Sequence, residues 1–376
     1  MTFLVKENIS LAPLTTLSIG GLARYFTEAA TENTVLDALD FARQHDLPVF
    51  ILGGGSNILV SDNGFPGLVL RIAIRHFSFA ERSKTVIVRA GAGVNWDNLV
   101  ADCVAKKLSG IECLSGIPGW VGGAPVQNIG AYGQEVGRVI TRVKAYDLST
   151  RSVVELSGVE CMFNYRSSIF NTSARDRYVV LEVDFELSQS GKPECRYPDL
   201  VRYFESRSDS PSLQETRNAV QAIRASKAML LVAGEPDSRS AGSFFKNPLV
   251  SAEQSVLLEE NARNLGVLAP GSSLPHFDAE NGVKIPAAWL IESAGFSKGF
   301  ARGRVGLSSK HTLAIVNRGG ACAKEVLTFA REIQERVEEA FGICLHTELA
   351  FVGIPKDVRE RFGAFSPTIK SNEALI

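Results

Sequence analysis

The residues best suited to chemistry lie in two glycine-rich segments. The first, residues 53–57 (Gly-Gly-Gly-Ser-Asn), directly follows a short apolar run. Three glycines let backbone N–H groups converge on an anion without obstruction by side chains, and Ser56 and Asn57 add side-chain donors. Such a loop suits a phosphate or pyrophosphate. A tight turn that binds nothing is the alternative interpretation.

The second segment is longer and unusually poor in charge. Residues 114–137 carry seven glycines and two prolines, so they cannot form one regular element. Within them, residues 116–133 combine glycines with the amides of Gln127 and Asn128 and the ring of Tyr132. Backbone approach, amide hydrogen bonds and an aromatic ring suit a flat heterocycle joined to phosphates. A mobile surface loop would be more polar.

Other nucleotide and metal signatures are absent from the sequence. No Gly-x4-Gly-Lys-Ser/Thr motif occurs, which argues against a P-loop kinase or ATPase. Residues 91–96 (Gly-Ala-Gly-Val-Asn-Trp) place Trp96 where a dinucleotide motif needs its third glycine. The six cysteines form no Cys-x-x-Cys pair and the five histidines are dispersed, so we expect no metal site.

Hydrophobic patterns divide the chain into three regions that must position these segments. Residues 1–75 and 76–215 are each predicted to be α/β units, and residues 216–349 a third region, with residues 350–376 as a candidate to complete the first. The expected helices include 34–45, 96–108, 218–227, 251–265, 285–294 and 323–341, and the expected strands include 49–52, 85–90, 178–187 and 243–245. The polar tail beyond residue 355 is expected to be loosely ordered.

Composition sets the class of protein. The 376 residues carry a net charge of −1, which argues against a nucleic-acid-binding protein. Apolar runs are too short to span a bilayer, and the first ten residues lack an apolar signal core. We therefore expect a cytoplasmic protein that uses neither nucleic acid nor a membrane as a partner. A monomeric state is a separate expectation that composition does not address.

Together, the motifs resemble the UDP-N-acetylenolpyruvoylglucosamine reductases of bacterial cell-wall synthesis. The resemblance covers roughly residues 8–353. It rests on five ordered motifs and a final glutamate: residues 16–20 (Thr-Leu-Ser-Ile-Gly), 52–59 (Leu-Gly-Gly-Gly-Ser-Asn-Ile-Leu), 117–133, 165–170 (Tyr-Arg-Ser-Ser-Ile-Phe), 241–248 (Ala-Gly-Ser-Phe-Phe-Lys-Asn-Pro) and Glu348.

This resemblance implies a fold and a reaction. The fold would be α+β, with a two-part FAD-binding region of the vanillyl-alcohol-oxidase (PCMH) type and a third α+β domain that binds the substrate. NADPH would reduce FAD, leave, and be replaced in the same pocket by UDP-N-acetylglucosamine enolpyruvate. Hydride would then pass from the reduced flavin to C3 and a proton to C2, which gives UDP-N-acetylmuramate for peptidoglycan synthesis.

The resemblance also implies three catalytic residues. Ser243 matches the serine that protonates C2, Arg166 the arginine that pairs with the substrate carboxylate, and Glu348 the glutamate beside the enolate carbon. A guanidinium group suits bidentate binding of a carboxylate. The alternative interpretations are a small strand residue, a surface arginine and an edge-strand carboxylate, respectively.

Further residues are assigned to ligands by the same resemblance. The cofactor set is Gly53, Gly54, Gly55, Ser56, Asn57, Ile117, Pro118, Gly119, Gly122, Gly123, Ala124, Gln127, Asn128, Gly130, Ala131, Tyr132 and Gly133. The substrate set is Tyr165, Tyr197, Lys227, Lys246 and Asn247. Tyr197 lies in residues 195–200 (Cys-Arg-Tyr-Pro-Asp-Leu), which resemble the tyrosine loop of one subgroup of the family.

Two departures and two rival functions accompany this interpretation. The stretch from Lys227 to Ser243 is longer than the family pattern, and Trp120 stands where a smaller residue is expected. One rival is an FAD-dependent alcohol or sugar oxidase of the same broad fold, which should lack residues 241–248 together with Glu348. The other is a non-catalytic module that binds UDP-sugars.

Overall fold

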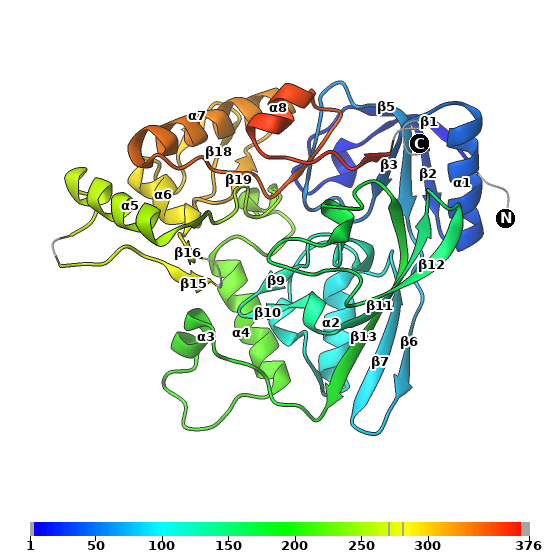
Figure 1. The fold of residues 1–376 in the computed structure, drawn as a ribbon, viewed down its shortest axis with the longest axis horizontal. Helices are drawn as coiled ribbons and strands as arrows, with labels where there is room; N and C mark the ends of the chain where they lie inside the picture. The colour runs from blue at the N-terminus through cyan, green and yellow to red at the C-terminus, as the bar shows by residue number, and fades with distance from the viewer. Residues whose placement is uncertain (1–3, 270, 280–281, 370–376) are drawn as a thin grey trace.

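The computed structural model describes residues 4–269, 271–279 and 282–369. The first region contains a five-stranded sheet of order β1-β2-β5-β3-β21. Its strands are β1 (Lys6–Ser10), β2 (Leu22–Ala29), β5 (Phe65–Ile72), β3 (Val49–Leu52) and β21 (Thr368–Ile369). Helix α1 (Glu32–Gln44) is capped by Thr31 and buries Val35, Ala38, Leu39 and Ala42, which recur on one helical face. Figure 1 shows α1 beside this sheet.

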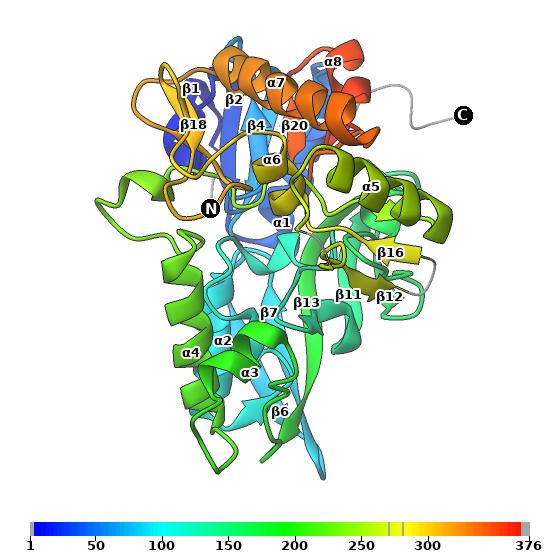
Figure 2. The same cartoon turned by 90° about the vertical axis from the view of Figure 1, so that its left-hand side faces the viewer.

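The second region is built on an antiparallel sheet of order β12-β11-β13-β7-β6, with β8 paired to β13. Its strands are β12 (Ser152–Ser157), β11 (Ile140–Asp147), β13 (Tyr178–Gln189), β7 (Thr85–Gly91), β6 (Phe77–Glu81) and β8 (Leu108–Ser109). Helix α2 (Trp96–Ala105) begins at the Asn95 cap and buries Trp96, Leu99, Val100 and Cys103. Figure 2 shows α4 (Leu213–Ser226) beside α2.

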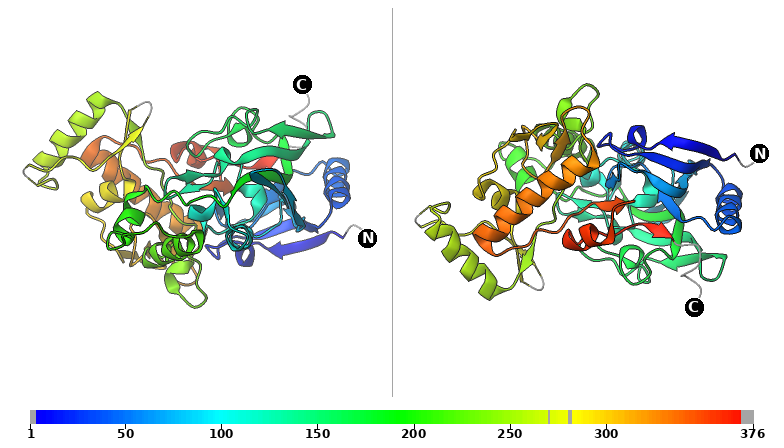
Figure 3. Two further views of the ribbon diagram at one scale, coloured as in Figure 1. Left: turned by 90° about the horizontal axis from the view of Figure 1, so that it is seen from below. Right: turned by 90° about the horizontal axis from the view of Figure 1, so that it is seen from above.

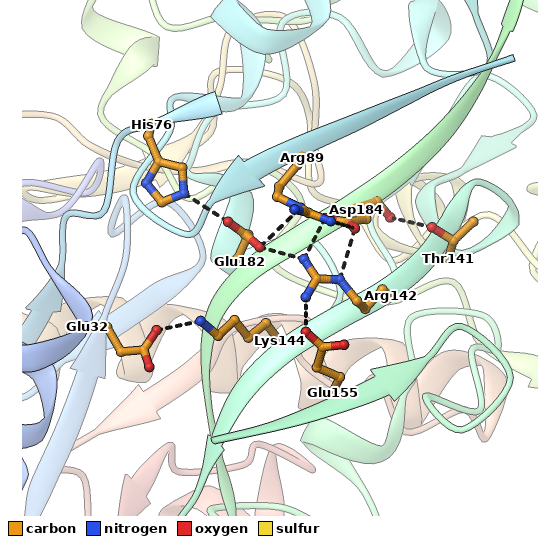
Figure 4. Close-up of polar contacts among 9 residues, drawn as sticks. All are labelled: Glu32, His76, Arg89, Thr141, Arg142, Lys144, Glu155, Glu182 and Asp184. Carbon is orange, nitrogen blue, oxygen red and sulfur yellow. Dashed lines mark hydrogen bonds and ion pairs between the residues drawn. The ribbon is translucent and has the colours of Figure 1, made fainter. Parts of the chain in front are cut away.

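Charged side chains form a network across four strands of this sheet (Figure 4). Arg142 on β11 donates to both carboxylate oxygens of Asp184 on β13, at 2.9 and 3.0 Å, and Arg89 on β7 binds the same carboxylate at 3.1 Å. Arg142 also binds Glu182 and Glu155. Because opposite charges lie on adjacent strands, the network supports the register of the sheet.

Short elements and one long helix make up the third region. Its helices are α5 (Ala252–Asn264), α6 (Ala287–Ser293) and α7 (Ala323–Phe341), and its strands are β14 (Leu249–Val250), β15 (Phe277–Ala279), β16 (Gly282–Lys284), β17 (Ala301–Arg302), β18 (Val305–Leu307) and β19 (Ile315–Asn317). Gly342 ends α7 in the left-handed conformation, at φ 69°. In Figure 3, α5 projects at the end of the molecule away from the N-terminus.

The remaining elements connect these regions. They are α3 (Pro198–Tyr203), α8 (Lys356–Arg361), β4 (Ile58–Val60), β9 (Gly130–Ala131), β10 (Gln134–Glu135) and β20 (Ala350–Val352), with 3-10 turns at Ala12–Leu14, Glu112–Leu114, Val121–Gly123, Val136–Arg138, Ile169–Asn171 and Pro236–Ser238. β20 pairs with β4, and β21 pairs with β3, so the end of the chain returns to the first region.

Three of the four hydrophobic clusters formed by the described residues underlie the arrangement. One cluster is shared by the first two regions, from α1 across β5 to α2 and β13. A second fills the third region and includes Leu17, Leu59 and Phe351 from outside it. A third lies under β2, β3 and β5. The division at residues 75, 215 and 349 remains a prediction.

Two expectations about elements are wrong. Residues 243–245 do not form a regular strand: Phe245 makes only an isolated bridge to Thr347. Gly242 at φ 71° and Pro248 flank the segment, and both interrupt a strand ladder. The tail beyond residue 355 is not loosely ordered as far as residue 369, because it forms α8 and β21 and buries Phe362. Among the described residues, no helix is long and apolar enough to cross a membrane.

Candidate cofactor and substrate site

A cavity of about 670 Å³ lies where the three regions meet. Both glycine-rich segments line it. Residues of the third region, such as Ser243, Asn247 and Glu348, also line it, as does Phe365 from the segment beyond that region. Its size and its origin between regions are typical of a site for a small molecule or cofactor.

The first glycine-rich loop connects β3 to β4 and packs against the second loop. The Ser56 hydroxyl donates to the Pro118 carbonyl oxygen at 2.9 Å. A Cβ atom added to Gly54 would lie 2.7 Å from Cα of Gly119, so side chains are excluded between the loops. An added Cβ at Gly53 or Gly123 would meet nothing within 4 Å. The backbones at these two positions therefore face open space that an anionic group can enter.

The second loop is fastened to the end of β7 and the start of α2. The Val121 and Gly122 amides donate to the carbonyl oxygens of Val94 and Ala92, both at 2.9 Å. Between the loops, Asn57 Nδ2 donates to Gln127 Oε1 at 2.7 Å and to the Glu348 carbonyl oxygen at 3.2 Å. These bonds fix the loops relative to each other and to the segment that leads into β20.

One part of the cavity gathers Ser243, Arg166 and Glu348. Arg166 Nε lies 2.8 Å from Glu348 Oε1, and Arg166 Nη2 donates to the Gly130 carbonyl oxygen at 2.9 Å. The Glu348 amide donates to the Phe244 carbonyl oxygen at 2.9 Å, which holds Glu348 beside the residue that follows Ser243. The Ser243 hydroxyl makes no hydrogen bond to a described residue. It is free to act on a ligand.

Positive charge predominates around this group. Burial lowers the pKa of Lys246. The negative charge of Glu348 acts in the opposite direction, and the positive charge of Arg166 lowers the pKa further. Burial also lowers the pKa of Lys284, where Glu135 opposes the shift and Arg166 adds to it. Burial disfavours the charge of Arg166, but Glu348, Tyr165 and Glu135 together outweigh it, and the pKa of Arg166 is raised. Three cationic side chains thus lie close to two carboxylates, which favours an anionic ligand.

Comparisons with known proteins identify the family. A family model for an FAD-binding domain matches residues 23–157, and one for the carboxy-terminal domain of UDP-N-acetylenolpyruvoylglucosamine reductase matches residues 235–352. The UDP-N-acetylenolpyruvoylglucosamine reductase of Thermobifida fusca is 44% identical over 360 residues, which cover 94% of this chain and 99% of that protein. The chain belongs to the UDP-N-acetylenolpyruvoylglucosamine reductase family. The reductase of Mycobacterium marinum is 41% identical over 361 residues, covering 93% and 95%.

A solved structure agrees with this assignment. The UDP-N-acetylenolpyruvylglucosamine reductase of Thermus caldophilus superposes with a TM-score of 0.63 at 26% identity, covering 93% of this chain and 99% of that one. The expected α+β fold with an FAD-binding region of the PCMH type is confirmed. The protein is an FAD-dependent oxidoreductase of this family, which removes the rival oxidase and the non-catalytic module.

The geometry of the cavity fits FAD. Two glycine backbones face open space between interlocked loops, which suits a diphosphate, and the cavity continues on one side to Ser243, Arg166 and Glu348. On another side it is lined by apolar residues of β3, β5 and β13, which suit an aromatic base.

Most residues of the reductase that were predicted to bind ligands line this cavity. Tyr197 lies with its ring edge-on to Tyr132 at 5.5 Å and stacked with Phe277 at 6.5 Å. Lys227 Nζ lies 2.6 Å from Asp199 Oδ2. Asn247 Oδ1 accepts a hydrogen bond from the Ala287 amide. Their assignments to the substrate remain predictions.

Four predicted residues lie outside the lining: Asn128, Gly133, Tyr165 and Lys246. The Asn128 side chain is engaged within the protein. It donates to Glu135 Oε2 and to the Asn164 carbonyl oxygen, both at 3.0 Å, and accepts from the Gly137 amide at 2.8 Å. The Tyr165 ring is covered by Lys284 Nζ at 3.6 Å from the centroid.

The structure also adds residues that the sequence did not single out for a role. His311 lines the cavity, and burial, together with Lys227 and Lys298, lowers the pKa of its imidazole to about 4. Arg224 donates to the Gly116 carbonyl oxygen at 3.1 Å and so holds the start of the second loop. Nothing in the sequence around His311 indicates that it lines a cavity, and nothing around Arg224 indicates that it holds the second loop.

Trp120 is part of the cavity wall. The guanidinium groups of Arg71 and Arg75 lie 4.4 and 5.5 Å from its ring centroid. The larger ring that replaces the expected small residue is thus accommodated by cation–π contacts with Arg71 on β5 and with Arg75, which follows that strand.

Proposed function

We propose that this reductase uses NADPH to convert UDP-N-acetylglucosamine enolpyruvate into UDP-N-acetylmuramate. The observation that carries the proposal is the convergence of Ser243, Arg166 and Glu348 beside the two interlocked loops. Residues 53–57 and 117–124 would hold the FAD diphosphate with backbone amides. Bound FAD supplies the hydride chemistry, from NADPH to C3 of the enolpyruvyl group.

Arg166 binds the substrate carboxylate in this proposal. Glu348 and the Gly130 carbonyl oxygen fix the guanidinium group, so it is oriented before the substrate arrives. Negative charge develops at C2 and on the carboxylate after hydride addition to C3. Arg166, with Lys246 and Lys284 nearby, stabilises that charge in a site shielded from water.

Ser243 donates the proton to C2. Its hydroxyl lines the cavity and has no competing partner among the described residues. A serine hydroxyl is a weak acid, but the surrounding cations favour loss of its proton. The other end of the substrate, the UDP group, would meet Tyr197, Lys227 and Asn247, which line the same cavity. One cavity for NADPH and for the enolpyruvyl sugar requires that they bind in turn.

Replacement of Ser243 tests the proposal. In anaerobic stopped-flow experiments, Ser243→Ala should leave the reduction of FAD by NADPH within about twofold of the wild type. It should slow the reoxidation of the flavin by UDP-N-acetylglucosamine enolpyruvate by at least roughly 100-fold, because a positioned acid contributes about that factor or more. Ser243→Cys, which restores an acidic hydrogen, should recover part of the loss.

The first half-reaction is the internal control. Equal losses in both half-reactions, or none in the second, would show that Ser243 is not the acid. A monomeric state and a cytoplasmic location remain predictions from the sequence.

A further inference from the structure

The end of the chain contributes a wall to the cavity that the proposed chemistry does not use. We call residues 363–369 the carboxy-terminal segment. Phe365, Pro367 and Ile369 line the cavity, and β21 pairs antiparallel with the start of β3. The Phe351 amide donates to the Phe365 carbonyl oxygen at 2.9 Å, which ties the segment to β20 as well. Figure 1 shows the segment running from α8 to β3.

The carboxy-terminal segment lies apart from the reacting groups. Ile369 pairs with Val49, four residues before Gly53, or about 13 Å along a strand at about 3.3 Å per residue. Phe365 lies beside Phe351, three residues or about 10 Å beyond Glu348. If the flavin faces Ser243 and the diphosphate lies between the loops, the adenosine of FAD occupies the part of the cavity that the carboxy-terminal segment lines. This step rests on the proposed function.

Asp176 is the acidic residue in this part of the cavity. It lies in the turn before β13, at φ 62°, and the cavity wall near it includes Phe170, Tyr178 and Val180. Its carboxyl group makes no hydrogen bond or ion pair with any described residue. A half-buried carboxyl group that lines the cavity and has no donor among the described residues is available to accept a hydrogen bond from a ligand.

The surrounding charges do not neutralise Asp176. Burial raises the pKa of its carboxyl to about 6, although Arg175 and Arg359 act in the opposite direction. Both arginines direct N–H groups elsewhere. Arg175 donates to the Asn171 carbonyl oxygen and Arg359 donates to the Ile354 carbonyl oxygen, both at 3.1 Å. The Arg175 guanidinium group also lies over the Phe365 ring at 5.8 Å.

We propose that Asp176 and the carboxy-terminal segment form the adenine subsite of the FAD site, in which the Asp176 carboxylate accepts a hydrogen bond from the adenine N6 amino group. Phe365 and Ile369 supply an apolar wall for the base. The amino group is the donor on this edge of adenine, so a carboxylate is its complement. A carbonyl oxygen at the same position would face the carboxylate with two acceptors and no hydrogen.

A cofactor analogue tests the proposal directly. Flavin is removed from the full chain, and the dissociation constants of FAD and flavin hypoxanthine dinucleotide are measured by flavin fluorescence. The analogue carries a carbonyl oxygen in place of the N6 amino group. The wild type should bind FAD at least tenfold more tightly than the analogue. In Asp176→Asn the ratio of the two dissociation constants should fall below threefold. The carboxamide of Asn can donate to the carbonyl oxygen of the analogue as well as accept from the amino group of FAD.

Two further variants separate the parts of the subsite. Phe365→Ala should weaken the binding of both cofactors at least threefold. It should leave the ratio of their dissociation constants unchanged, because it removes part of the apolar wall and no hydrogen-bonding group. Asp357→Asn, an exposed carboxylate on α8, should change neither constant. The melting temperature of each apoprotein shows that the variant is folded.

The outcomes distinguish this proposal from the function on which it rests. An unchanged ratio in Asp176→Asn, or no preference in the wild type, overturns the role of Asp176. Unchanged binding in Phe365→Ala overturns the role of the carboxy-terminal segment. If the protein still binds FAD and NADPH still reduces the bound flavin, the proposed function stands in either case. A wild type that binds neither FAD nor the analogue would contradict both the adenine subsite and the proposed function.

Discussion

At the scale of the residue, the ion pair of Arg166 and Glu348 shows how a weak sequence signal gains meaning. The two residues lie 182 positions apart, and each one alone is an ordinary charged residue. Their side-chain atoms lie 2.8 Å apart, and the Glu348 amide is hydrogen-bonded to the residue that follows Ser243. The motifs around them predicted all three, because a run such as residues 241–248 preserves the types of the residues and their spacing.

His311 could not be predicted in this way. It stands alone in sequence, and its environment is created by Lys227, Lys298 and Asp199 from distant segments. Only the folded chain places these charges around a buried imidazole. The effect on its titration is therefore a property of the tertiary structure.

The low pKa of His311 predicts a loss of stability in acid. The unfolded chain binds a proton near pH 6.5 and the folded chain only near pH 4, so stability falls as the pH drops through this window. At 1.36 kcal/mol per pKa unit, the free energy of unfolding of the apoprotein should fall by at most roughly 2 kcal/mol between pH 6.5 and pH 5 from this group. Urea unfolding at pH 7 and pH 5 measures it.

His311→Gln should make the stability less dependent on pH over the same interval. His276→Gln is the matched control, in which the same substitution is made at a histidine whose side chain is 46% exposed. Equal pH dependence in the wild type and in His311→Gln would mean that His311 is not the titrating group.

At the scale of the element, the regular helices could be predicted and the short pieces could not. The apolar spacing over residues 323–341 predicted α7 at its observed bounds, and Gly342 ends the helix in the left-handed conformation. The strands of the third region have two or three residues each, too few to show an alternating pattern. The expected strand over residues 243–245 is reduced to a single bridge, between Phe245 and Thr347. Its partner lies about a hundred residues further along the chain, so local sequence does not show how far the pairing extends.

The two glycine-rich loops give a prediction that separates packing from binding. An added methyl group at Gly53 meets nothing within 4 Å, whereas one at Gly54 lies 2.7 Å from Gly119. Gly53→Ala should leave the free energy of unfolding of the apoprotein within about 1 kcal/mol of the wild type. It should weaken the binding of FAD at least tenfold, because the methyl group would occupy the space in which we place the diphosphate.

Gly54→Ala should behave differently. It forces the loops apart and should lower the stability of the apoprotein by roughly 1–3 kcal/mol, besides weakening FAD. Urea unfolding and flavin fluorescence provide the two readouts. Destabilisation by Gly53→Ala, or normal FAD binding in either variant, would contradict the assignment of these loops.

At the scale of the whole molecule, the pairings that close the site join segments far apart in the chain. β20 lies beside β4, β21 beside β3, and the second sheet meets α1 through Lys144 and Glu32 at 2.6 Å. Hydrophobic periodicity reports elements but not which of them pair. The sequence therefore indicated residues 350–376 only as a candidate to complete the first region and did not show that the tail lines the cavity. The family motifs conveyed the overall fold because they span most of the chain.

The reduction and reoxidation of the bound flavin, followed anaerobically in the wild type, test the central claim most directly. NADPH should bleach the flavin absorbance, and UDP-N-acetylglucosamine enolpyruvate, added after the removal of excess NADPH, should restore it with one UDP-N-acetylmuramate formed per flavin. A flavin that NADPH reduces but that the enolpyruvyl sugar leaves bleached would contradict the account.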